Sequence, residues 1–255
     1  MSQGTDHATR PAAAPVQSSR RRVDPVQVVL GGVGELLITV GLLLGLFVVW
    51  QLWWTDVVAG RLQDEVVADL GWDVPAAEPV VGDPARRDAP PVLPAPAQGV
   101  TFATLVVPRW GPDYERPVTE GVGRAAVLDT LGIGHYPGTA MPGEVGNFSL
   151  AGHRVTYNKP FHLVEELEPG DALVVRTEEV WYVYTVTETR VVLPEQVEVI
   201  APSPGRPDAA PQEAMITLTT CHPMFSARER FVVHGVLDHW LPVADGTPVE
   251  LAAGA

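Results

Sequence analysis

The sequence predicts an all-β domain with short helices, folded as a closed barrel or a sandwich of seven or eight strands and preceded by one transmembrane helix. Three observations support this prediction. Residues 36–55 form a run of twenty residues without a charged side chain, which as a helix is about 30 Å long and matches the hydrocarbon core of a bilayer. From about residue 100 onward, short β-rich segments alternate with Pro/Gly-rich turns, as in β-barrels and sandwiches. The chain has one cysteine, Cys221, in 255 residues, which excludes an intramolecular disulfide and a cysteine-rich metal cluster.

The first 55 residues predict a cytoplasmic tail and a membrane anchor. Residues 1–25 are polar, end near three consecutive arginines and carry four Arg against two Asp, a net charge of +2, so we expect a disordered tail on the cytoplasmic side. Residues 26–55 form the predicted anchor. A cleaved signal peptide has an apolar stretch of only about 7 to 15 residues, so the run of twenty favours an uncleaved anchor. Residues 57–59 (Val-Val-Ala) nevertheless resemble a weak cleavage site. Three tryptophans at the far end of the anchor suit a membrane interface and place the rest of the chain outside the cell: Trp50, Trp53 and Trp54.

Residues 56–98 are predicted to connect the anchor to the β-domain. Apolar residues that recur every four positions predict a short amphipathic helix at the membrane surface: Val58, Leu62, Val66 and Leu70. Seven prolines follow within residues 75–96. This composition is typical of a semi-stiff, extended stalk.

Residues 99–245 are predicted to form the β-domain, and residues 246–255 a C-terminal tail. Two short helices are predicted, at 124–131 and 194–200. Each predicted strand is a β-rich run bounded by turn-forming residues. The predicted strands are 100–107, 116–122, 147–152, 172–177, 181–192, 215–221 and 230–240.

The charge distribution argues against nucleic acid as a partner. Seventeen basic and thirty-one acidic residues give a net charge of −14, and because residues 1–25 carry +2, the other 230 residues carry −16. Binding to phosphate backbones requires clustered positive charge. We therefore expect an acidic external domain and no nucleic-acid partner.

Cys221 ends a predicted strand and lies on the polar face of that strand. Because successive side chains of a strand alternate between its two faces, Cys221 shares a face with Thr217 and Thr219, whereas Ile216 and Leu218 occupy the other. A lone cysteine is most often a small buried hydrophobe. The polar face instead favours a functional thiol.

The same alternation makes His153 a second candidate. Asn147, Ser149 and His153 share one face of the strand that begins at Asn147. Gly152 leaves room for close approach of another backbone or of a ligand. A hydrogen-bonded structural histidine remains the alternative.

Arg230 is a third candidate, nine residues after Cys221 at the start of the last predicted strand. A planar guanidinium is well suited to donate hydrogen bonds to an oxyanion or a substrate carbonyl. Spacing alone distinguishes Arg230 neither from Arg228 nor from a solvated residue at a sheet edge.

Together these segments resemble the sortase family. The TLTTC segment at 217–221, the AGH segment at 151–153 and an arginine that enters a Val-rich strand resemble the TLxTC box, histidine and arginine of sortases. CHPMFSARER at 221–230, GHYPG at 134–138 and GELL at 34–37 resemble class E, the housekeeping sortases of actinobacteria. The resemblance covers the anchor and roughly residues 100–240, but not the stalk.

The resemblance implies an eight-stranded sortase-type β-barrel and a cysteine transpeptidase without a cofactor. Cys221 would attack the Thr–Gly bond of an LPxTG or LAxTG sorting signal on a surface protein and form a thioester. His153 would act as general acid and base, Arg230 would stabilise the oxyanion, and Thr220 would assist there. The acceptor would be an amine of a lipid-linked peptidoglycan precursor.

Other residues receive smaller roles. Tyr157 is predicted to line a substrate groove, and His222, on the face opposite Cys221, to tune the substrate pocket. His135 is predicted to shape a loop. His234 and His239 are five residues apart on one strand and therefore on opposite faces, and no HExxH motif or Cys/His cluster occurs, so we expect no metal site.

Several alternatives remain open at the level of sequence. The chain is compatible with a tethered cysteine hydrolase that performs no transfer, and with a non-catalytic β-domain that binds a cell-wall partner. A pilin-polymerising sortase is disfavoured because no Asp-Pro-aromatic lid precedes the barrel and because fifteen residues after Trp240 are too few to span a membrane again. Gly41 and Gly45 form a GxxxG pair, which predicts a weak helix dimer.

Overall fold

The structure is a computed structural model, which describes residues 25–72 and 85–252. The predicted tail at 1–25 therefore lies outside the described residues, apart from Pro25. The chain divides into two compact units, one ending at Val49 and one beginning at Trp50.

Helix α1 (Pro25–Asp69) contains the predicted anchor and continues through the predicted amphipathic segment without a break. Its N-terminal part is long and apolar enough to cross a membrane, by length and composition. The helix ends where Gly71 adopts a left-handed φ of 63°, a conformation that glycine adopts without strain. Val58 and Leu62 of the expected apolar stripe are exposed, whereas Ala59 and Gln63 are buried, so the stripe stays a prediction for the membrane surface. The buried face of the helix contacts the β-domain through polar groups as well as small ones.

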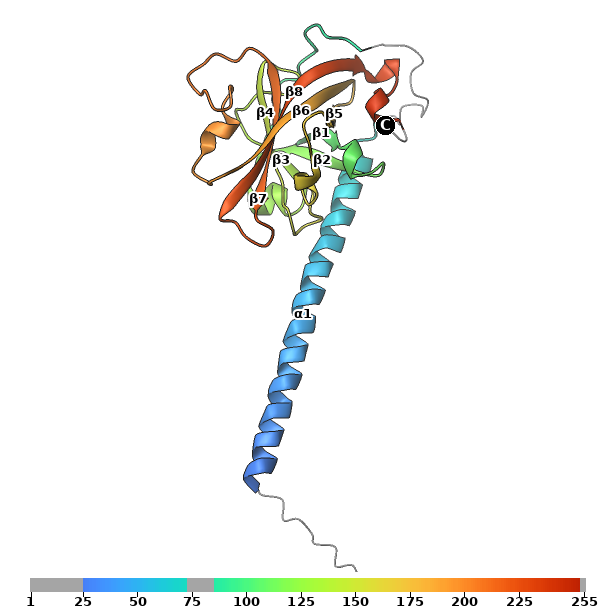
Figure 1. Cartoon of the computed structure of the whole chain (residues 1–255). Coiled ribbons are helices and arrows are strands. Elements are labelled where there is room, and N and C mark those ends of the chain that lie inside the picture. The colour runs from blue at the N-terminus through green and yellow to red at the C-terminus, as the bar shows by residue number, and fades with distance from the viewer. Residues whose placement is uncertain (1–24, 73–84, 253–255) are drawn as a thin grey trace, which may run out of the picture. The chain divides into compact units, whose positions relative to one another are not determined.

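The described residues contain eight strands, which close into one barrel (Figure 1). This closure confirms the predicted barrel and excludes the sandwich. The strand order around the barrel is β1-β2-β3-β4-β7-β8-β6-β5. The strands are β1 (Thr101–Val106), β2 (Glu115–Glu120), β3 (Ile133–His135), β4 (Gly146–Ala151), β5 (Ala172–Arg176), β6 (Val180–Val192), β7 (Ala214–His222) and β8 (Glu229–Pro242).

The core fills the inside of the barrel, and alternation along the strands decides which residues reach it. Phe148 and Leu150 of β4, and Ile216 and Leu218 of β7, are fully buried members of the main apolar cluster. Thr217 and Thr219 therefore project from the other, outer face of β7. The face assignments made for these two strands from sequence are confirmed.

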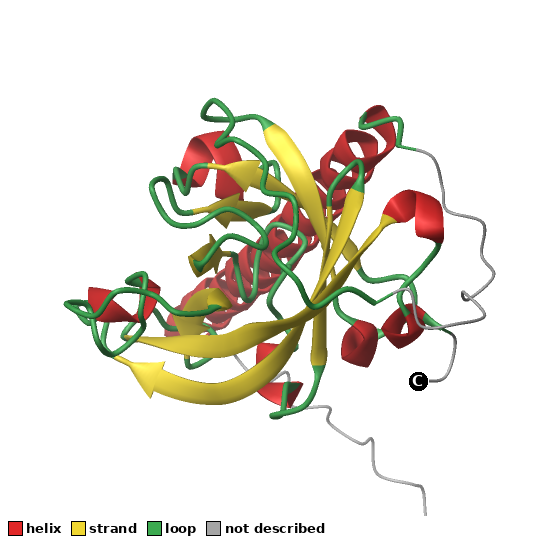
Figure 2. Ribbon diagram, turned by 90° about the horizontal axis from the view of Figure 1, so that it is seen from above, coloured by secondary structure: helices red, strands yellow, loops and turns green. Residues whose placement is uncertain are grey.

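Short helical turns occupy the loops between the strands (Figure 2). Two of them fall within the predicted short helices, at Arg124–Leu128 and Val197–Ile200. A third, Val249–Leu251, lies in the predicted C-terminal tail, where Leu251 packs on a small apolar cluster that contains Trp181 and Leu241. The described part of this tail is thus joined to the barrel.

The described part of the predicted stalk, residues 85–98, is bound to the barrel. Arg86 forms a two-way backbone bridge with Trp240, with N···O distances of 2.9 and 3.0 Å. The Tyr182 hydroxyl donates to the Pro91 carbonyl oxygen at 2.6 Å. An extended proline-rich chain leaves its carbonyl groups unpaired, and the barrel satisfies some of them here. The first three prolines of the segment lie at or before residue 84, outside the described residues.

Candidate active site

Strand register relates the positions of the three principal candidate residues. On β7 and β8, Cys221 pairs directly with Arg230. On the parallel pair β4 and β7, Ala151 pairs with Thr219, so His153 and Cys221 each follow this pair by two residues. Residues that pair across neighbouring strands share a face of the sheet. Register therefore places Cys221 and Arg230 on one face of the sheet, with His153 just beyond the neighbouring strand.

The chains of β4 and β7 stay side by side beyond the end of β4. The Gly152 amide donates to the Thr219 carbonyl oxygen at 3.2 Å, and the Thr220 hydroxyl donates to the Gly152 carbonyl oxygen at 2.7 Å. Thr220 is buried and alternates away from Cys221. Its contact is thus with the backbone that precedes His153, and its predicted role toward substrate remains a prediction.

Gly152 itself is required by packing. A Cβ added there would lie 2.8 Å from the Phe161 ring. The close approach expected at Gly152 is therefore made by an aromatic side chain. Because Phe161 is fully buried, this contact fixes where the chain leaves β4 and turns into His153.

His153 is held from two sides. Its Nε2 lies 2.7 Å from Oδ1 of Asp129, and its ring centroid lies 5.1 Å from that of Tyr157. Asp129 ends the helical turn Arg124–Leu128, and Arg124 Nε is 3.7 Å from the same carboxylate oxygen. Sequence reasoning missed Asp129 because it lies in a loop 24 residues before His153, with no motif to mark it.

Arg230 contacts its own hairpin in this structure. Its Nη1 donates to the carbonyl oxygens of Ala227 and Glu229, both at 2.9 Å. Arg228 lies in the loop before β8 and is exposed, whereas Arg230 is paired with Cys221 by register. Position therefore favours Arg230 over Arg228 as the arginine of the site.

Arg154, the residue after His153, is buried and contacts the backbone of Cys221. Arg154 is 2% exposed, and its guanidinium lies 3.4 Å from the Cys221 carbonyl oxygen, 3.0 Å from His222 Nδ1 and 2.6 Å from Glu165. It also lies over the Phe231 ring at 5.9 Å. Hydrogen bonding from Arg154, reinforced by His222, holds the pKa of Glu165 below its ordinary value against the opposing effect of burial.

His222 contacts Arg154 and Glu165 and lies on the face of β7 opposite Cys221. Its Nδ1 lies 2.9 Å from Glu165, and its ring lies 5.8 Å from that of Phe231. The expected face is therefore confirmed, and its predicted influence on a substrate pocket remains a prediction. Arg154 carried no signal in the sequence beyond its place after His153.

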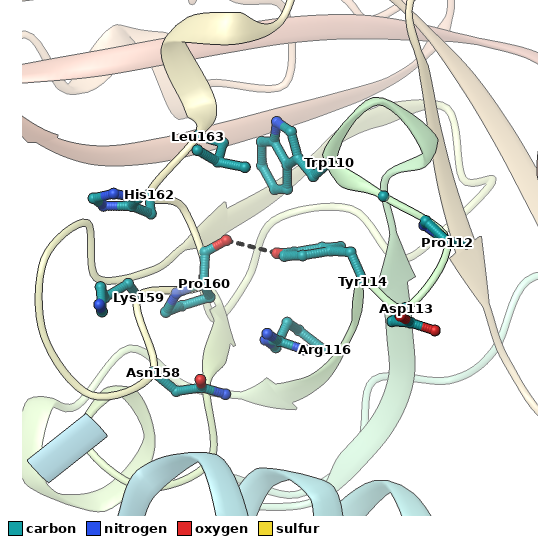
Figure 3. Close-up of a pocket in the computed structure, with 11 residues that line it drawn as sticks. Trp110, Pro112, Asp113, Tyr114, Arg116, Asn158, Lys159, Pro160, His162 and Leu163 are labelled. Carbon is teal, nitrogen blue, oxygen red and sulfur yellow. Dashed lines mark hydrogen bonds between the residues drawn. The ribbon is translucent and has the colours of Figure 1, made fainter. Parts of the chain in front are cut away.

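A cavity of about 440 Å³ lies beside the loop that follows His153 (Figure 3). The Tyr114 hydroxyl points across it and donates to the Pro160 carbonyl oxygen at 2.6 Å. Burial raises the pKa of Tyr114 far above its ordinary value. Tyr157 is not among the lining residues, so its predicted place in a substrate groove remains a prediction. The cavity is lined by Trp110, Gly111, Pro112, Asp113, Tyr114, Arg116, Asn158, Lys159, Pro160, His162 and Leu163.

His135 makes structural contacts. His135 is buried in β3, where Nδ1 lies 2.5 Å from Glu120 and Nε2 lies 2.9 Å from the Thr139 hydroxyl. It thus holds the turn that follows β3, as a loop-shaping residue does.

Tyr136, which sequence reasoning did not select, lies 3.0 Å from the Thr219 hydroxyl and so contacts the outer face of β7. Within residues 25–72 and 85–252, no group of three or more His, Cys, Asp or Glu residues is arranged to hold a metal.

The fold is a closed eight-stranded barrel in which Cys221 of β7 pairs with Arg230 of β8 and His153 lies two residues beyond the end of β4. The family model of the sortase domain matches residues 105–238, and the chain belongs to the sortase family. Sortase SrtE1 of Streptomyces coelicolor is 36% identical over 243 residues, which cover 93% of this chain and 65% of that relative. Sortase SrtE2 of the same organism is 39% identical over 213 residues, which cover 80% of each chain.

A solved structure supports the same class. The crystal structure of Sortase E1 from Streptomyces coelicolor with a tripeptide in the active site is 38% identical, covers 61% of this chain and 99% of that chain, and has a TM-score of 0.55. These relatives confirm the resemblance to class E. The chain spans slightly less than two thirds of the length of SrtE1.

Proposed function

We propose that this chain is a membrane-anchored transpeptidase that cuts a C-terminal LPxTG- or LAxTG-type sorting signal between Thr and Gly and transfers the protein to a cell-wall amine. One observation carries the proposal: register pairs Cys221 with Arg230, and the neighbouring strand β4 ends two residues before His153, beside Thr219. Membership of the sortase family supports it. The tripeptide in the active site of the related Sortase E1 supports a peptide substrate.

The first half-reaction forms a thioester. The thiolate of Cys221, a partly exposed residue next to the end of β7, attacks the Thr carbonyl carbon, and the C–N bond to Gly then breaks. His153 gives a proton to the departing amine. Arg230 stabilises the oxyanion: a guanidinium has five N–H donors, so its two backbone contacts leave donors for a substrate.

The second half-reaction reverses these roles. An incoming amine attacks the thioester carbon, His153 accepts the proton of that amine, and the Cys221 thiolate departs. Asp129 orients the imidazole through its bond to Nε2, which leaves Nδ1 as the nitrogen that exchanges the proton. A carboxylate that fixes the tautomer of a catalytic histidine in this way is a recurring device.

The membrane topology is part of the proposal. We place the N-terminus in the cytoplasm and the barrel outside the cell, because the arginines at 20–22 precede the apolar run, and Trp50 and Trp54, whose rings stack 6.0 Å apart, lie at its far end. The acceptor is the amine of a lipid-linked peptidoglycan precursor. A weak dimer through Gly41 and Gly45 stays a prediction; both glycines are exposed on α1.

Product analysis tests the proposed reaction. The full chain is incubated with a sorting-signal peptide, with and without an added amine such as triglycine, and the products are identified by mass. We expect an amide with the added amine, and loss of cleavage in Cys221→Ala and in His153→Ala. Hydrolysis without any amine product would identify a hydrolase, and cleavage that survives both substitutions would leave a non-catalytic binding domain.

Separate alanine substitutions test the choice of arginine. We expect Arg230→Ala to lower kcat strongly, because the change removes the guanidinium of the residue that pairs with Cys221 across β7 and β8. Arg228→Ala is the matched control, since this side chain lies in the exposed loop. Loss of activity in Arg228→Ala alone would overturn the assignment.

A further inference from the structure

The loop that follows His153 contains three consecutive residues in a conformation that L-residues rarely adopt. Tyr157, Asn158 and Lys159 have φ angles of 55°, 65° and 46°. Such left-handed backbone is unfavourable for residues other than glycine and persists where surrounding contacts enforce it. Tyr157 is also the residue whose ring lies against His153. The contacts that enforce this loop therefore bear on the imidazole.

Helix α1 supplies those contacts. Gln63 donates from Nε2 to the Tyr157 carbonyl oxygen at 3.2 Å, and its Oε1 accepts from Asn158 Nδ2 at 2.9 Å. The Asp56 carboxylate accepts from the backbone N–H of Asn158 at 3.2 Å, and its other oxygen lies 2.9 Å from Lys159 Nζ. All three left-handed residues are thus bound, through backbone or side chain, by two residues of one helix.

The spacing and the packing of α1 suit this role. Asp56 and Gln63 are seven residues apart, which is about two helical turns, so they share one face. Ala59 and Gly60 lie between them on the helix, and a Cβ on Gly60 would already contact Asn158 at 3.4 Å. Small residues here let the helix and the loop approach closely.

Gln63 also abuts the second segment that holds His153. A Cβ at Gly132, three residues after Asp129, would lie 3.2 Å from Gln63 Cδ. Gln63 is 1% exposed although it is polar, and a buried amide is costly unless it is hydrogen-bonded. One side chain of α1 therefore lies between the Tyr157 loop and the Asp129 segment, which contact His153 from its two sides.

We propose that the segment Asp56–Gln63 of α1 is a positioning element of the active site, and that Gln63 is a positioning residue that sets the imidazole of His153 relative to Cys221. The helix that contains the membrane anchor is then also a structural part of the catalytic unit. This inference rests on the proposed function for its effect on turnover, but its effect on the reactivity of the thiol is independent of any substrate.

The test compares Gln63→Ala with Asp64→Ala in the full chain in detergent micelles. Asp64 is the adjacent helical residue, exposed and outside the site. Two quantities are measured: the rate of Cys221 alkylation by iodoacetamide at pH 7, which is site-specific because the chain has one cysteine, and kcat and KM for a sorting-signal peptide. We expect Gln63→Ala to lower the alkylation rate at least threefold and kcat about tenfold, since small displacements of catalytic groups cost large factors in rate.

The control and a second variant keep the inference falsifiable. Asp64→Ala is expected to stay within about twofold of wild type in both quantities. A merely structural role of Gln63 would lower Tm and leave both rates of the folded protein unchanged, and this result would overturn the inference. If Gln63→Ala does not fold, Asp56→Ala removes the weaker, partly exposed contacts, and wild-type rates in that variant would overturn the inference equally. Absence of peptide cleavage in wild type would contradict the proposed function alone, because the alkylation comparison still decides the role of Gln63.

Discussion

Asp129→Asn is the substitution that isolates the carboxylate behind His153. The two side chains have the same shape, so the change removes the charge and leaves the packing. His153 Nε2 lies 2.7 Å from Asp129 Oδ1, and the side chains of His153 and Asp129 are 15% and 19% exposed. A hydrogen bond to a charged group contributes about 1.5 to 3 kcal/mol, and partial solvent access places this one near the lower value. At about 1.4 kcal/mol per factor of ten, we expect kcat to fall roughly tenfold.

The assay is steady-state cleavage of a quenched fluorescent sorting-signal peptide by the full chain. KM should change less than kcat, because the carboxylate contacts the imidazole and not the substrate. Asp208→Asn, in an exposed loop between β6 and β7, is the matched control and should behave as wild type. If kcat of Asp129→Asn stays within twofold of wild type while His153→Ala is inactive, Asp129 does not orient the imidazole.

Two further predictions concern stability. Gly152→Ala places a Cβ 2.8 Å from the buried Phe161 ring, and we expect the free energy of unfolding to fall by about 1 to 3 kcal/mol; an unchanged urea midpoint would contradict this packing. Burial lowers the pKa of His234 to about 4, below the value of about 6.5 for an unfolded chain. The unfolded state therefore binds more protons between these values, so up to about 3 kcal/mol of stability is lost as pH falls from about 6.5 to 4. His234→Gln should lose less stability than wild type between pH 7 and pH 4.5, and an identical loss would show that His234 does not titrate as expected.

Alternation of side chains along strands was predictable from sequence because it follows from backbone geometry. Thr219 and Cys221 share the outer face of β7, and Ile216 and Leu218 fill the core. Register was not predictable, since it depends on which strands become neighbours. β3 was missed because only three residues, Ile133–His135, form it.

The supports of the site were not visible in the sequence for a related reason. Asp129, Arg154 and Gln63 carry no motif and act through contacts between distant segments. The helical spacing of apolar residues predicted a face that contains Val58 and Leu62. The face of α1 that contacts the β-domain instead contains Gln63, which forms hydrogen bonds there. Composition likewise predicted an extended proline-rich segment but not the barrel groups that hold its described part.

Mass spectrometry of the acyl-enzyme tests the central claim most directly. The full chain is mixed with a library of LxxTG peptides, stopped in acid and digested, and the peptide containing Cys221 is analysed. We predict an added mass equal to the substrate up to its Thr carbonyl group, bound as a thioester at Cys221, which disappears when an amine acceptor is added. Cleavage of peptide at the Thr–Gly bond with no adduct at Cys221, and undiminished in Cys221→Ala, would contradict the account.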